Sequence, residues 1–439
     1  MRFFWLIFSI ILYFISPNEY NFFICLIASL IFVLLAIRTL KNNYNKKNYL
    51  SFFIFFSISF FFVNFFYPII IYPFDKDYFI VFSRFSFNEK IITKATVLAL
   101  IAYCSFLYGL DPSKLKVSQK LVAPKILYLN LNNYILKSIF ILALIFNFSL
   151  FFFAKDGISS RRSDAFFEIA PSLMVFCQVL VNMIIIMVFY LKKSYSFLIL
   201  PFLYILTFLY VGDRGPALQS ILVFLFAYHY FHKKIKIRIL FFLIVIGFIS
   251  LTIISSTRGR NGSKNIKEIQ IVKYYDFAMD FIIVNRNLYA GYDYANKNGY
   301  AYGKSYLPYV FSPFPLMPSF VSNSLFNKEP RELSSGTILT KEANASWGLG
   351  TNLVSDIYMQ FGLLGVILFM LNLGYLLRYL ELNFSKSLYI SMVYFFLISF
   401  SIYMPRSTLF DSFRYVSWAL LLYFFIYAIF KPFHKLRDA

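Results

Sequence analysis

Long apolar runs separated by short polar connections constrain this chain more than any other feature. Hydrophobic residues make up 60% of its 439 residues and charged residues only 14%, whereas soluble domains have roughly 45–50% and about 25%. This composition excludes a cytosolic enzyme, a secreted domain and a disordered protein. We predict an all-α polytopic membrane protein with about 12 transmembrane helices. The predicted helices lie near 3–16, 20–38, 50–72, 91–110, 134–154, 173–191, 197–211, 217–231, 239–255, 353–377, 388–404 and 415–430.

Basic residues in the short connections predict the topology. If the N-terminus is cytoplasmic, the second, fourth, sixth and eighth connections all place an excess of Lys and Arg inside, while the intervening connections are nearly neutral. Positive charge is enriched on the cytoplasmic side of membrane proteins. We therefore expect both termini in the cytoplasm. The bases that support this are Arg38, Lys41, Lys46, Lys47, Lys114, Lys116, Lys120, Lys125, Lys192, Lys193, Lys233, Lys234, Lys236 and Arg238.

One connection, residues 256–352, is far longer than the others and is expected on the outer side. Structureless loops of this length are uncommon in folded proteins, so we expect it to fold into something functional. Apolar spacing over 265–287 predicts an amphipathic helix at the membrane surface. The prolines between 308 and 318 predict an irregular wall or lid. The chain thus divides into helices 1–9 (1–255), this loop (256–352), and helices 10–12 with a cytoplasmic tail (353–439).

The net charge of +22 does not predict nucleic-acid binding, because no basic soluble-looking domain carries it. Cys25, Cys104 and Cys177 lie inside apolar runs and read as small buried hydrophobes. There is no phosphate-binding or dinucleotide-binding glycine motif, so no cofactor is expected. The acidic pair Asp75 and Asp77 has a spacing that could hold a metal, but such a short pattern arises easily by chance, and no metal is expected.

The tight turn Gly212-Asp213-Arg214-Gly215-Pro216 lies between two apolar runs. Charged residues at membrane depth are costly and therefore mark candidate functional sites. Asp213 and Arg214 would lie at the tip of this turn, facing the outside or a cavity. The alternative is a structural one, because Asp can cap a helix and Pro favours the first helical turn. The sequence leaves both interpretations open.

Several arginines are expected on the outer side, where positive charge is otherwise depleted. Arg258 and Arg260 lie where the ninth helix leaves the membrane. A guanidinium group matches phosphate oxyanions with a fork of donors, although it can equally reach lipid headgroups. The further outward arginines are Arg161, Arg162, Arg286, Arg331 and Arg406.

A glycine-rich turn over 347–352 leads into the tenth helix, where Asp356 is expected about one turn from the start, followed by Tyr358. A carboxylate there can be explained by the helix dipole alone. It is also the best candidate for a general base near outward arginines. No histidine competes for this role, because His229, His232 and His434 are all expected at the cytoplasmic face.

With these segments, the chain resembles the Wzy-type O-antigen polysaccharide polymerases of bacterial inner membranes. The turn at 212–216 continuing to Gln219 is the most specific match, together with a large late outer loop, its segment from Pro313 to Ser319, and the segment from Gly348 to Gly362. The residue-level match is confined to about 60 positions, and the layout matches over the whole chain.

The resemblance implies a metal-independent, GT-C-like glycosyltransferase of the inner membrane. It would transfer a growing polysaccharide from undecaprenyl pyrophosphate to a lipid-linked repeat unit at the periplasmic face, with a chain-length regulator and a flippase as further partners beside membrane lipids. Asp356, then Glu342, would act on the acceptor hydroxyl, and tyrosines such as Tyr289, Tyr292, Tyr294, Tyr300 and Tyr302 could stack on sugars. The pyrophosphate and sugar contacts would come from Arg214, Asp213, Arg258, Arg260, Arg286, Arg406 and Tyr358.

Two other classes share this layout. The related O-antigen ligases use a histidine in the large outer loop, and residues 256–352 contain none. A flippase or transporter of the same lipid-linked oligosaccharides should carry its cations in the middle of spans, whereas most of these arginines lie in connections. The polymerase interpretation is therefore favoured over the ligase and over the flippase or transporter.

Overall fold

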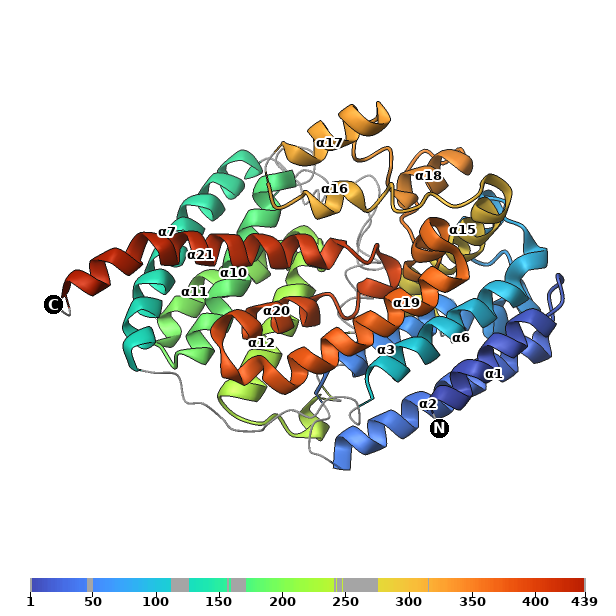
Figure 1. Ribbon diagram of the computed structural model, residues 1–439, viewed down its shortest axis with the longest axis horizontal. Helices are drawn as coiled ribbons and strands as arrows, with labels where there is room; N and C mark the ends of the chain where they lie inside the picture. The colour runs from blue at the N-terminus through green and yellow to red at the C-terminus, as the bar shows by residue number, and fades with distance from the viewer. Residues whose placement is uncertain are drawn as a thin grey trace, which may run out of the picture. The chain divides into compact units, whose positions relative to one another are not determined.

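A computed structural model of the chain describes residues 2–45, 50–111, 126–155, 158, 171–240, 242, 247, 275–314 and 316–437 (Figure 1). Helices are the regular elements of these ranges, and no strand occurs in them. The all-helical prediction is therefore confirmed. Eleven of the twelve predicted runs coincide with described helices, whereas the run at 239–255 lies mostly outside the described residues.

By length and apolar composition, six described helices could cross a membrane, or seven if one bent pair forms a single span. The chain is thus a multi-pass membrane protein, and the number of about 12 spans stays a prediction. The bent pair turns by 46° between Phe52–Asn64 and Tyr67–Asp75. The six candidates are Phe22–Asn42, Glu89–Gly109, Leu131–Phe153, Ser172–Tyr190, Leu353–Lys386 and Asp411–Pro432.

The contacts divide the chain into two compact units. The first comprises Met1–Ser118, Ala278–Leu382 and Ser401–Arg414. It contains the following helices: α1 (Arg2–Ile15), α2 (Phe22–Asn45), α3 (Phe52–Asn64), the π-helical turn Tyr67–Ile71, α4 (Tyr72–Asp75), α5 (Ile80–Arg84), α6 (Ile92–Gly109), α14 (Met279–Ile282), α15 (Asn285–Asn298), α16 (Leu307–Val310), α17 (Met317–Phe326), α18 (Ser335–Glu342) and α19 (Leu353–Asn383).

Helix α6 forms the centre of the first unit, and nearly all of its residues are buried. A helix that is apolar all round is covered either by protein or by lipid. Helix α6 is covered by protein, because α1 and α2 both pack against it. Gly109 on α6 and Gly374 on α19 allow these two helices to approach closely. A Cβ at either glycine would overlap backbone atoms of the facing helix, Leu371 O and Phe106 O. Small residues permit such close packing of membrane helices.

The second unit comprises Gln119–Phe277, Asn383–Phe400 and Tyr415–Ala439. Its central helix is α10, which is largely buried, and α7, α11, α12 and α20 pack against it. Helix α21 begins in the first unit and continues into the second. The helices of this unit are α7 (Ile126–Phe153), α10 (Pro171–Tyr190), α11 (Ile199–Val211), α12 (Arg214–Phe231), α20 (Leu388–Ser399) and α21 (Asp411–Arg437).

Helix α19 is broken at Gly362, which has φ 64° and ψ −159°. This backbone region is essentially reserved for glycine. The break leaves two carbonyls, those of Met359 and Gln360, to accept hydrogen bonds at 2.9 Å from the amides of Ala301 and Tyr302. A short helical segment, 353–361, therefore precedes the main part of α19 and is attached to residues 301–302.

The amphipathic helix predicted over 265–287 falls partly outside the described residues. From residue 276 onward the chain forms a short 3-10 turn, α14 and α15, with an interruption at 283–284. Ile282 and Leu288 are buried within the first unit. The division of the chain at 255 and 352, and the outer position of the loop, stay predictions.

We predict that Gly374→Ala destabilises the protein, because its Cβ must displace the backbone of α6. Overpacking of this kind costs about 1–3 kcal/mol, so the melting temperature in detergent should fall. Gly348→Ala is the matched control, since a Cβ there meets nothing within 4 Å. Equal melting temperatures for the two variants would contradict the close α6–α19 packing.

Candidate active site

Asp356 is fully buried near the start of α19. Its Oδ1 accepts a hydrogen bond of 2.6 Å from Ser335 Oγ, and its Oδ2 accepts one of 2.9 Å from Tyr306 Oη. Ser335 Oγ also lies 2.9 Å from Thr351 Oγ1. Among the described residues, no Lys or Arg forms an ion pair with this carboxylate. Asp356 is thus a buried carboxylate that is held by neutral hydroxyl groups. No described cation pairs with it.

Asn352 places Asp356 at this point by starting α19. Its Oδ1 accepts the amide hydrogen of Val354 at 2.9 Å, and its carbonyl accepts that of Asp356 at 2.8 Å. Asn is among the preferred residues for this capping position. The remaining amide group of Asn352 donates to Asn64 Oδ1 at 2.9 Å. The end of α3 therefore fixes the beginning of α19.

Three consecutive residues at the start of α15 tie further segments to this region. Asn285 donates to the carbonyl of Val63 at 2.8 Å, and Asn287 donates to the carbonyl of Leu349 at 2.7 Å. Arg286 between them is only 2% exposed. All three side chains satisfy backbone carbonyls, so α15 holds the end of α3 and the glycine-rich turn in fixed positions.

Arg286 is buried within the first unit, and its position on the outer side of the membrane stays a prediction. Its Nε and one Nη donate to the carbonyls of Phe85 and Ser86 at 3.4 and 3.2 Å, and its other Nη donates to Asn287 Oδ1 at 3.4 Å. Burial lowers the pKa of the Arg286 guanidinium to about 10. It therefore remains charged at neutral pH. In this structure its guanidinium holds the segment after α5 through two backbone carbonyls, whereas the sequence predicted that Arg286 contacts the pyrophosphate.

Two tyrosines from the segment around α16 interact with the carboxylate, Tyr306 through a hydrogen bond and Tyr309 through the charge of the carboxylate. Burial, and then the negative charge of Asp356, raise the pKa of Tyr306 well above its ordinary value. Burial, followed by the carboxylates of Asp411 and Asp356, also raises the pKa of Tyr309. Both phenols therefore stay protonated at any physiological pH. Tyr306 acts as a hydrogen-bond donor to Asp356 and does not compete with it for a proton.

Tyr358 belongs to an aromatic cluster on the other side of the short segment of α19. Its hydroxyl donates to Asn296 Oδ1 at 2.9 Å, and its ring stacks on Tyr292 with centroids 4.8 Å apart. Tyr289 and Tyr292 are buried against other side chains of the protein, and the expectation that they stack on sugars stays a prediction. Of the tyrosines named for that role, Tyr300 and Tyr302 are 38% and 75% exposed.

The turn at 212–216 belongs to the second unit and has a clear local role. Gly212 has φ 87° and ends α11, which favours glycine. Asp213 Oδ1 accepts the amide hydrogen of Gly215 at 3.2 Å and caps α12. The structural interpretation of Asp213 is thus supported. The part that Arg214 plays in chemistry stays a prediction.

The remaining sequence candidates are distributed as follows. Arg406 lies over the ring of Phe281, with its guanidinium carbon 5.6 Å from the centroid. Glu342 is exposed at the end of α18. Arg258 and Arg260, with Arg161 and Arg162, lie outside the described residues. Within the described ranges, no three His, Cys, Asp or Glu side chains come close enough to hold a metal ion.

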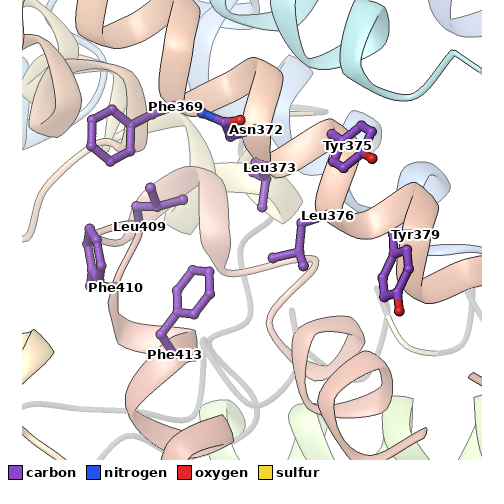
Figure 2. Close-up of a pocket in the computed structure, with 9 residues that line it drawn as sticks. All are labelled: Phe369, Asn372, Leu373, Tyr375, Leu376, Tyr379, Leu409, Phe410 and Phe413. Atoms are coloured by element: carbon purple, nitrogen blue, oxygen red, sulfur yellow. The ribbon is translucent and has the colours of Figure 1, made fainter. Parts of the chain in front are cut away.

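A groove with a volume of about 560 Å³ lies beside this site in the first unit. Figure 2 shows residues of α19 along one side, facing Leu409, Phe410 and Phe413 on the other. The lining is apolar except for three side chains on α19. The α19 residues are Phe369, Asn372, Leu373, Tyr375, Leu376 and Tyr379.

Comparison with known proteins agrees with the resemblance noted in the sequence. The family model described as O-antigen polysaccharide polymerase Wzy matches residues 1–437, which is nearly the entire chain. No curated protein and no solved structure matches the chain.

We predict that Asn352→Ala lowers the stability of the protein. Loss of the cap costs about 1 kcal/mol, and the buried oxygen of Asn64 loses its donor, which adds about 1–3 kcal/mol. Thermal unfolding in detergent measures the effect. Ser334→Ala removes the analogous cap of the short helix α18 and should have a smaller effect, because Ser334 lies nearer the surface. An Asn352→Ala protein as stable as Ser334→Ala would contradict the role given to Asn352.

Proposed function

The chain belongs to the O-antigen polysaccharide polymerase Wzy family, and from this premise we propose its reaction and its catalytic group. The growing polysaccharide is carried on undecaprenyl pyrophosphate, and the acceptor is a second lipid-linked repeat unit. An acceptor hydroxyl attacks the anomeric carbon of the growing chain, a new glycosidic bond forms, and the bond to the pyrophosphate breaks. The products are a chain longer by one unit and free undecaprenyl pyrophosphate.

Asp356 is proposed as the base that takes the proton of the acceptor hydroxyl. The observation that supports this is a buried carboxylate with hydroxyl donors and no ion pair among the described residues. A hydroxyl from a bound sugar can replace Ser335 or Tyr306 as the partner of one carboxylate oxygen. General bases must lie within hydrogen-bond reach of the proton that they remove. Glu342 is the second candidate, and it lies exposed at the end of α18.

The leaving pyrophosphate carries negative charge that needs cations. We propose Arg214, Arg258, Arg260 and Arg406 for this role. Arg286 is a weaker choice, because its donors are engaged with backbone carbonyls. Tyr358 and Asp213 were expected near the sugars. The hydrogen bond of Tyr358 to Asn296 and the cap formed by Asp213 favour structural roles for both.

The reaction is proposed at the periplasmic face of the inner membrane, with both termini in the cytoplasm. The candidate span Leu353–Lys386 has 34 residues, more than the roughly 20 needed to cross a bilayer. The part after Gly362 is long enough to span by itself. The short segment that bears Asp356 therefore fits the interface, where a lipid-linked headgroup can reach it.

Deletion of the gene followed by gel analysis of lipopolysaccharide tests this proposal. Polymerase activity requires that the deletion strain carry single repeat units on the lipopolysaccharide core, and that a plasmid copy restore the full ladder. Loss of even the single unit would point to a ligase or flippase, and an unchanged ladder would exclude all three assignments.

We predict that Asp356→Asn abolishes long chains while the protein still folds. Asn keeps the size of the side chain and an oxygen to accept from Ser335, but it cannot accept a proton. General-base catalysis contributes about 10²–10⁴-fold, so the rate should fall by at least the lower figure. Complementation of the deletion strain measures it, with protein level checked in membranes. Glu342→Gln is the control and should leave the ladder intact; the reverse pattern would assign the base to Glu342.

Arg214→Ala is expected to leave only single repeat units on the core, because the pyrophosphate loses a cation. Asp213→Asn is the matched control, since Asn also caps helices and thereby preserves the turn. Normal ladders from a stably expressed Arg214→Ala protein would remove this residue from the proposed site. Loss of the ladder in both variants would indicate that the turn is needed for folding and that the guanidinium of Arg214 has no separate role.

A further inference from the structure

We propose that the groove between α19 and residues 409–413 binds the isoprenoid chain of the lipid-linked substrate. The inference rests on the proposed function, because it assumes that the substrate carries such a chain. It goes further by giving that chain a location and a set of contact residues.

The size and lining of the groove fit a long uncharged chain. Its volume of about 560 Å³ lies within the range of about 300–1,000 Å³ found for ligand sites. From Phe369 to Tyr379 the lining follows α19 over ten helical steps, or about 15 Å at the helical rise. None of the nine lining residues is charged. The groove is therefore elongated, mostly apolar and suited to a hydrocarbon chain.

Tyr306 connects this groove to Asp356. The ring of Tyr306 lies 4.6 Å from that of Phe410 and 6.0 Å from that of Phe369, measured between centroids. Both phenylalanines line the groove, while the hydroxyl of Tyr306 donates to Asp356. One end of the groove thus lies one side chain away from the proposed base. A chain bound in the groove would place its attached headgroup beside Asp356.

The orientation follows from the same residues. Phe369 and Phe410 mark the end near Tyr306, and Tyr379 marks the far end of the lining on α19 (Figure 2). Leu373 and Leu376 point into the groove between these ends, toward Leu409 and Phe413 (Figure 2). The pyrophosphate is therefore expected near Tyr306, and the distal isoprene units near Tyr379.

Photolabelling of the purified full-length protein in detergent tests the proposal. The probe is an undecaprenyl phosphate analogue with a diazirine on its isoprenoid chain, and peptide mapping locates the adduct. We expect labelling within 369–379 and 409–413. Leu376→Trp fills the groove and should reduce labelling severalfold. Leu368→Trp is the matched control, because Leu368 is on the same helix, 49% exposed and not part of the lining; it should label as the natural protein does.

Each other outcome has a defined meaning. Adducts elsewhere in the natural protein, or equal labelling of Leu376→Trp, would overturn the groove. This holds even if one variant fails to fold, because the map is made on the natural protein. Equal competition by excess phosphatidylglycerol and by undecaprenyl phosphate would assign the groove to ordinary membrane lipid and also overturn the proposal. Asp356→Asn should keep full labelling, so that lost polymerisation and lost binding are measured separately.

Discussion

The hydrogen bond between Asn64 and Asn352 is the contact on which the candidate site depends most. It joins residues 288 positions apart in the chain and couples the end of α3 to the cap that begins α19. Buried amides without partners cost about 1–3 kcal/mol each, so each member of this pair specifies the position of the other. Asn285 and Asn287 add two further hydrogen bonds to backbone carbonyls of the same segments. This network of hydrogen bonds therefore fixes the position of Asp356.

The buried network consists of amides and hydroxyl groups, and the neutral charge of these groups affects the chemistry of Asp356. An ion pair would hold Asp356 as firmly, but a cation at that distance would reduce its tendency to accept a proton. Ser335 and Tyr306 hold the carboxylate through neutral donors instead. Tyr306 then contacts the groove through its ring. Tyr306 therefore contacts both the proposed base, Asp356, and the apolar groove.

Local patterns in the sequence predicted the local parts of this structure. The apolar runs predicted the helices, and the turn at 212–216 offered a cap at Asp213 as one of two open interpretations, because both depend on neighbours along the chain. The position of Asp356 near the start of a helix was predicted in the same way from the glycine-rich turn. Asp411 lies in a segment from which only Arg406 was selected, so its place beside Tyr309 was missed.

Contacts between distant segments were beyond the sequence. Nothing local indicates that Asn64 faces Asn352, or that Tyr306 and Ser335 meet the carboxylate. Nothing local shows that the guanidinium of Arg286 is buried against backbone carbonyls. The break at Gly362 could have been suspected from its glycine, but the carbonyls that it frees are satisfied by residues 301–302, about 60 positions earlier.

Polymerisation by the purified protein tests the central claim most directly. The chain is reconstituted into liposomes with undecaprenyl-pyrophosphate-linked repeat units as the only substrate, and the length of the lipid-linked products is measured by gel or mass spectrometry. The account predicts a series of products that grow by one repeat unit, together with release of undecaprenyl pyrophosphate. Repeat units that remain single, with a folded protein and substrate present on both faces of the membrane, would contradict it.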